Sequence, residues 1–130
     1  MIGTFGLSHL ALAVRDPPAS FGFYHAVFGM VAVYQDESFI QAQTPGTRDV
    51  LVLEKSRRGR GTSGGIAHFG FRLRDPADLP RAAEAVVSAG GTIVSQGEFC
   101  PGEPYLYCKD LDGYEVEIWY ELPTPVDPTE

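Results

Sequence analysis

The chain has 130 residues, of which 44% are hydrophobic and 21% charged, a composition typical of one soluble domain with a sizeable core. Its 17 acidic and 10 basic side chains give a net charge of −7, which disfavours nucleic acid as a partner. No apolar run approaches the ~20 residues that cross a bilayer, and the first residues do not resemble a signal peptide. We therefore expect a cytoplasmic protein with no membrane partner. Cys100 and Cys108 are expected to be free thiols.

The first half of the chain predicts a strand, a helix and three more strands. Alternating apolar residues indicate a strand over 7–14. Asp16 is a good N-cap for the helix that follows, and Gly29 is a good terminator. Turn residues then separate three extended segments, at 30–35, 39–43 and 49–54.

The second half repeats this order. Residues 9–17 and 68–76 share the pattern H-x-small-x-x-[Val/Leu]-R-D-P. A strand over 66–73 and a helix from Asp75 to Gly90 are followed by extended segments at 92–96, 105–109 and 114–121. The prediction is an α+β chain of two tandem βαβββ modules. We place module one at about 5–54, the linker at 55–65, module two at about 66–121 and a tail at 122–130.

Three side chains form a candidate metal site. Strand alternation places His9 and His68 at equivalent positions, on the faces turned away from the helices. Glu117 lies in mid-strand between two apolar residues, where a carboxylate is costly to bury unless it is paired or bound to metal. Two imidazoles and one carboxylate leave coordination positions open for water, substrate or O₂.

The paired modules, the segment FYHAVFG at 23–29 and the segment DLDGYEVE at 110–117 resemble the vicinal oxygen chelate superfamily. That group includes glyoxalases, bleomycin resistance proteins and extradiol dioxygenases. The resemblance implies a half-open mixed β-barrel with helices outside, and a homodimer in which modules of two chains complete each site. It also implies a divalent metal held by His9, His68 and Glu117. Fe(II) is the expected ion, with Mn(II), Ni(II) or Zn(II) as alternatives.

Two details of the resemblance favour chemistry like that of extradiol dioxygenases on a small substrate with adjacent oxygens. The position of a fourth ligand in glyoxalase I aligns with Val52, which cannot bind metal, although Glu54 would replace it if the register slipped by two. Tyr107 stands ten residues before Glu117, where extradiol enzymes place a tyrosine that contacts substrate. Arg72 is the candidate partner for an anionic group of the substrate.

Two alternatives remain open at this level. One is a glyoxalase-type lyase or isomerase that uses the same metal ligands. The other is a metal-free module that binds a small molecule or drug, as bleomycin resistance proteins do, by stacking on Trp119 and Tyr105. Fosfomycin resistance enzymes resemble this chain in the His-His-Glu set, but no arginine follows Glu117 to match their phosphonate-binding arginine.

Overall fold

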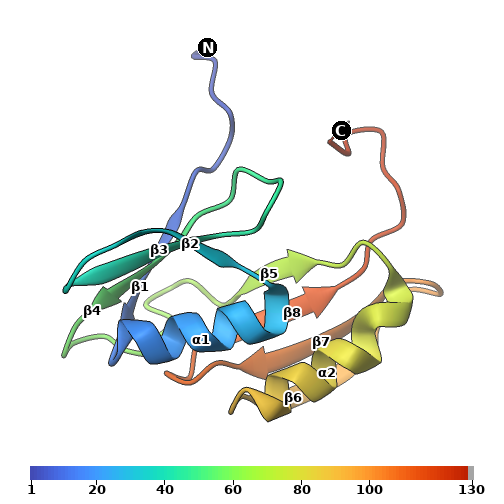
Figure 1. The fold of residues 1–130 in the computed structure, drawn as a ribbon. Coiled ribbons are helices and arrows are strands. Elements are labelled where there is room, and N and C mark those ends of the chain that lie inside the picture. Colours follow the sequence, from blue (N-terminus) through green and yellow to red (C-terminus); the bar gives the residue numbers. More distant parts are fainter. Residues whose placement is uncertain (129–130) are drawn as a thin grey trace.

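The computed structural model describes residues 1–128 and contains two four-stranded sheets and two α-helices (Figure 1). The first sheet has its strands in the order β1 (Leu10–Val14), β4 (Leu51–Lys55), β3 (Phe39–Gln43) and β2 (Val31–Gln35). The second sheet repeats that order with β5 (Phe69–Arg72), β8 (Glu115–Trp119), β7 (Pro104–Lys109) and β6 (Thr92–Glu98). In each sheet the first pair of strands is parallel and the other pairs are antiparallel.

The α+β prediction of two repeated βαβββ units is confirmed, and the sheets do not close into a full barrel. Strands β1 and β5 begin three residues later than predicted, at Leu10 and Phe69. A turn also intrudes on the predicted start of β5, since the amide of Ile66 donates to the carbonyl of Ser63 at 2.7 Å. The last two positions of the predicted tail, 129 and 130, lie outside the described residues.

Helix α1 (Pro17–Phe28) begins and ends where the sequence predicts. The Asp16 carboxylate accepts the amide of Ala19, and Gly29 ends the helix with a φ of 69°, which favours glycine. In the second repeat, Asp75 caps a 3₁₀ turn, η1 (Pro76–Asp78), that leads into helix α2 (Leu79–Ser88). Within residues 1–128, neither helix is long and apolar enough to span a membrane.

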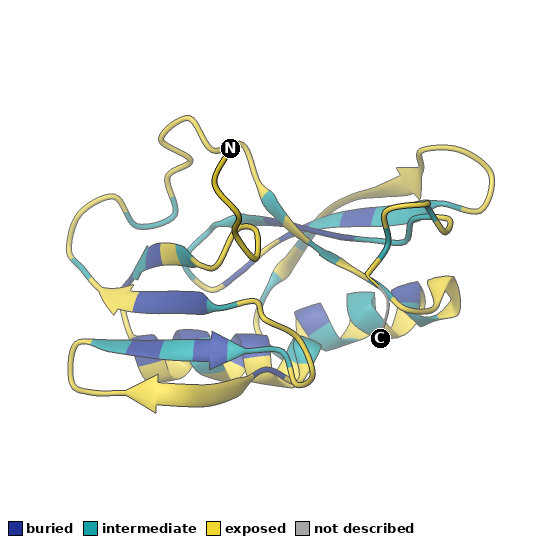
Figure 2. Cartoon of the chain, turned by 90° about the horizontal axis from the view of Figure 1, so that it is seen from above, coloured by how far each residue is buried: buried dark blue, intermediate teal, exposed yellow. Residues whose placement is uncertain are grey.

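One hydrophobic core joins both sheets and both helices. Figure 2 shows buried residues along α1, β4 and the inner strands of the second sheet, whereas β2 is exposed along its length. The core includes Tyr24 of α1, Leu53 of β4 and Val116 of β8, all fully buried. Cys108 also lies in this core, where burial raises the pKa of its thiol to about 12. Both cysteines are free thiols, as predicted.

Gly91, between α2 and β6, is expected to tolerate no side chain. A Cβ atom there would lie 2.7 Å from the carbonyl oxygen of Lys109, 2.7 Å from the ring of Phe23 and 2.9 Å from Val86. Gly91→Ala should therefore lower the free energy of unfolding by about 1–3 kcal/mol, as measured by urea denaturation. The control is Gly22→Ala in α1, where the added Cβ would meet no atom within 4 Å apart from the backbone of its own helix. It should raise stability by about 0.5–1 kcal/mol, and equal effects of the two changes would contradict the close packing of Gly91.

Candidate functional site

His68 and Glu117 meet on the open face of the second sheet. The parallel pairing of β5 with β8 places Gly70 beside Glu117, and His68 lies two residues earlier on the same face. Nε2 of His68 lies 3.1 Å from Oε2 of Glu117. A Cβ at Gly70 would lie 3.2 Å from the backbone carbonyl oxygen of Glu117, so the strands pack closely at this point. The buried Glu117 thus has the polar partner that its position requires.

Tyr107 lies directly beside this pair. It is the partner of Glu117 in the antiparallel register of β7 and β8. Its ring meets the His68 ring edge-on, with the centroids 5.1 Å apart and the planes at 84°. Desolvation, followed by the negative charge of Glu117, raises the pKa of the Tyr107 phenol. The phenol therefore stays protonated at neutral pH and can donate a hydrogen bond to a ligand.

His9, the third predicted ligand, does not join His68 and Glu117 within one chain. It is exposed, and its Nδ1 lies 2.8 Å from the hydroxyl of the neighbouring Ser8. No group of three His, Cys, Asp or Glu side chains that could hold a metal occurs among residues 1–128.

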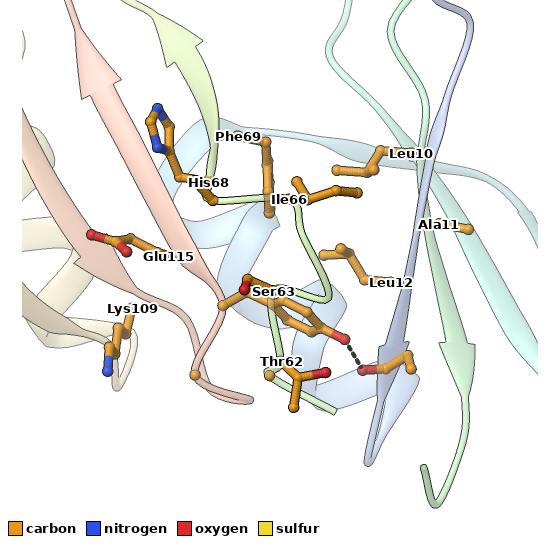
Figure 3. A pocket seen from close by; sticks show the side chains of 15 residues that line it. Leu10, Ala11, Leu12, Thr62, Ser63, Ile66, His68, Phe69, Lys109 and Glu115 are labelled. Atoms are coloured by element: carbon orange, nitrogen blue, oxygen red, sulfur yellow. Dashed lines mark hydrogen bonds between the residues drawn. The ribbon is translucent and has the colours of Figure 1, made fainter. Parts of the chain in front are cut away.

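The directions of the two sheet faces explain this separation. Strands β1 and β5 border a cavity of about 420 Å³, into which Leu10, Leu12 and Phe69 project (Figure 3). Ala11 of β1 also lines this cavity, but its side chain points to the side of the strand away from His68 (Figure 3). Alternation along each strand predicts a face within its own module, but it does not determine how the faces of two modules are turned relative to each other.

Val52 lies in the first sheet where Glu117 lies in the second, as the comparison of the two repeats predicts. Val52 pairs with Ala11 of β1 just as Glu117 pairs with Gly70 of β5, so the two residues occupy corresponding places. Glu54 lies two residues further along β4 and is exposed.

Arg72, at the end of β5, is paired with the C-terminal segment. Its guanidinium donates to both carboxylate oxygens of Asp127, at 2.6 and 3.1 Å, and to the carbonyl oxygen of Glu121 at 3.2 Å. The Glu121 carboxylate lies 3.5 Å away. The residue that sequence analysis assigns to an anionic substrate group therefore already has a carboxylate partner.

Three aromatic residues next to the site form a cluster that we call the aromatic platform: Phe99, Tyr105 and Trp119. Phe99 stacks on Tyr105 with ring centroids 4.2 Å apart and planes at 18°, and Trp119 meets Phe99 edge-on at 6.2 Å. Tyr105 in turn contacts Tyr107, at 5.5 Å. Phe99 could not be assigned to the site from the sequence, because it follows β6 in a turn, where strand alternation predicts no direction. The one feature of the sequence that could have drawn attention to Phe99 is its place as a large apolar residue between Glu98 and the Pro101-Gly102 turn.

A model of the Glyoxalase/Bleomycin resistance protein/Dioxygenase superfamily matches residues 6–118. The chain belongs to this superfamily. Its repeated modules and the facing His68 and Glu117 agree with the resemblance to vicinal oxygen chelate proteins. No curated protein matches the sequence significantly.

Solved structures share the superfamily fold at low sequence identity. The fosfomycin resistance protein FosX from Listeria monocytogenes has a TM-score of 0.76 and 18% identity, covering 94% of this chain and 96% of its own. FosX from Mesorhizobium loti has a TM-score of 0.73 and 21% identity, covering 92% and 95%. Lactoylglutathione lyase from Agrobacterium tumefaciens has a TM-score of 0.70 and 19% identity, covering 91% and 95%. At these identities the likeness establishes the fold and not the reaction.

Proposed function

We propose that this superfamily member is a cytoplasmic, divalent-metal-dependent enzyme that acts on a small substrate with two adjacent oxygens, by chemistry like that of extradiol dioxygenases. The observation that carries the proposal is the approach of His68 Nε2 to Glu117 Oε2, 3.1 Å apart on an open sheet face. An imidazole and a carboxylate that converge in this way suit Fe(II), and also Mn(II), Ni(II) or Zn(II). When bound, such an ion supplies a Lewis acid and a template for both substrate oxygens.

We further propose that the enzyme is a homodimer in which His9 of the partner subunit is the third ligand. Two features support this arrangement. His9 is exposed and lies apart from His68 and Glu117 within its own chain. Ala11, two residues after His9, points to the side of β1 that is turned away from His68 (Figure 3). A second copy can bring an exposed His9 to the open face, and a two-fold axis would then complete both sites at once.

The chain's own residues have distinct roles in this proposal. His68 and Glu117 hold the ion, and the protonated phenol of Tyr107 donates a hydrogen bond to a substrate oxygen. Trp119 and Tyr105 line the space next to Tyr107, where the substrate would lie. Arg72 would reach an anionic substrate group only after it released Asp127.

Metal analysis of the purified protein tests the proposed site. The wild-type chain is expected to bind about one divalent ion per chain, whereas His9→Ala, His68→Ala and Glu117→Ala should each weaken binding by on the order of 100-fold, since each removes one ligand. Glu84→Ala is the control, because it removes an exposed carboxylate from α2 without touching the sheet face. Equal metal content in all five proteins would overturn the proposal.

Oxygen uptake distinguishes the candidate reactions. After anaerobic loading with Fe(II), addition of a catechol and O₂ should consume oxygen, and Tyr107→Phe should slow this by roughly 100-fold while metal content is kept. Metal binding without oxygen consumption would instead favour the glyoxalase-type lyase or isomerase. Ligand binding without metal would favour the metal-free binding module.

A further inference from the structure

The aromatic platform lies one strand repeat from the proposed metal ligands. Trp119 follows Glu117 by two residues on the same face of β8, which separates them by about 7 Å. Tyr105 is the partner of Trp119 in β7, as Tyr107 is the partner of Glu117. A small molecule held at Glu117 and Tyr107 would therefore reach the platform with its far end.

The platform is shaped by a glycine and is open to solvent. A Cβ at Gly97 would lie 2.8 Å from the Tyr105 hydroxyl, so the Tyr105 ring lies over a backbone position that has no side chain. Phe99 stacks on this ring, yet 52% of Phe99 remains exposed. An ordered stack of rings with an open face is a binding surface for a planar or cationic group, because the ring faces carry negative potential.

The charges around the platform are acidic. Glu98 precedes Phe99 in the chain, and Glu103 lies across the same turn, where the amide of Phe99 donates to the Glu103 carbonyl at 3.1 Å. Arg72, the partner of Trp119 in β5, is neutralised by Asp127 and has Glu121 at 3.5 Å. The carboxylates of Asp127 and Glu121 outnumber the single guanidinium beside Trp119, and the ring faces carry negative potential, so both attract a cation and disfavour an anion.

We propose that the substrate carries a positively charged group, such as an ammonium, on the end opposite its two adjacent oxygens, and that this group lies on the aromatic platform. The inference rests on the proposed function, because the position of the oxygens is taken from the proposed metal site. Phe99 is then a specificity-determining residue that touches the remote end of the substrate and takes no part in the chemistry.

Three catechols that differ in the charge of one substituent test the proposal: dopamine, neutral 4-methylcatechol and 3,4-dihydroxyphenylacetate. Their binding to the Mn(II)-loaded protein is measured by calorimetry without oxygen. Dopamine is expected to bind about tenfold more tightly than 4-methylcatechol, and the carboxylate compound about tenfold more weakly. Trp119, the single tryptophan of the chain, should report dopamine by a change in its fluorescence.

Substitution on the platform should remove the selectivity and leave the rest of the site intact. Phe99→Ala is expected to bring dopamine to within about twofold of 4-methylcatechol, with unchanged Mn(II) content. Tyr34→Ala is the matched control, since Tyr34 is 53% exposed and stacks on Phe39 in the other sheet. It should leave all three affinities unchanged.

The outcomes separate this inference from the proposed function. If Mn(II) binds at His68 and Glu117 but the carboxylate compound binds as tightly as dopamine, the platform inference is wrong and the metal site stands. The same holds if Phe99→Ala weakens all three ligands equally. If no Mn(II) binds and dopamine still depends on Phe99, the platform stands and the proposed function is wrong.

Discussion

An equimolar mixture of His9→Ala and Glu117→Ala chains is expected to bind metal with wild-type affinity at about one quarter of its sites, although each variant alone should contain only weakened sites. After reversible denaturation of the mixture, about half of the dimers would contain one chain of each kind. In such a dimer, one site receives His9 from the Glu117→Ala chain and both His68 and Glu117 from the other chain. That site is intact, and the second site lacks two ligands.

The control mixture combines His68→Ala with Glu117→Ala. Both residues belong to the second sheet of one chain, so no pairing of these variants restores a complete set. This mixture should contain no site of wild-type metal affinity. Recovery in the control, or no recovery with His9→Ala and Glu117→Ala, would contradict a site shared between two copies.

Asp110→Ala is expected to lower the free energy of unfolding by about 3 kcal/mol, measured by urea denaturation. Asp110 is buried, and its carboxylate accepts the Tyr24 hydroxyl at 2.6 Å and the amides of Asp112 and Tyr114 at 3.0 and 2.9 Å. Desolvation raises the pKa of this carboxyl, and its hydrogen bonds oppose the shift. Alanine would leave three donors without an acceptor, one of them on the fully buried Tyr24.

Two variants calibrate this effect. Tyr24→Phe removes one of the three donors and should cost about 1 kcal/mol. Asp112→Ala removes a carboxylate two residues away, which within residues 1–128 accepts only the exposed amide of Arg15, at 2.9 Å. It should cost less than about 1 kcal/mol. A loss for Asp110→Ala as small as that for Asp112→Ala would show that the buried network does not stabilise the fold.

Most of the fold could be predicted from the sequence, because it depends on local signals. The N-caps Asp16 and Asp75 and the terminator Gly29 act within a few residues of themselves, and the structure bears them out. The pattern around Glu117 predicted a strand with this carboxylate in its middle, as observed, and Glu117 is buried there between Val116 and Ile118. What failed were strand lengths: β1, β5 and β8 are shorter than predicted and β6 is longer, because the extent of a strand depends on the backbone partners that it finds across the sheet.

The candidate site could be predicted only in part. His68, Tyr107 and Glu117 come together because they share one sheet face. The separation of His9 depends on how the two sheets are turned relative to each other, which the pattern of one strand does not encode. The pairing of Arg72 with Asp127 joins residues 55 apart in the chain through a segment without regular structure, and it left no periodic signal.

The shared core also means that the repeats are not independent bodies. Phe28 at the end of α1 stacks on Phe71 of β5, with ring centroids 3.8 Å apart. The hydroxyl of Tyr24, in the first repeat, donates a hydrogen bond to the carboxylate of Asp110, in the second. Each half-molecule would expose these apolar surfaces if it were separated from the other. A nick in the connecting segment 56–65 would therefore leave two fragments held together by their interior, in the manner of a non-covalent heterodimer.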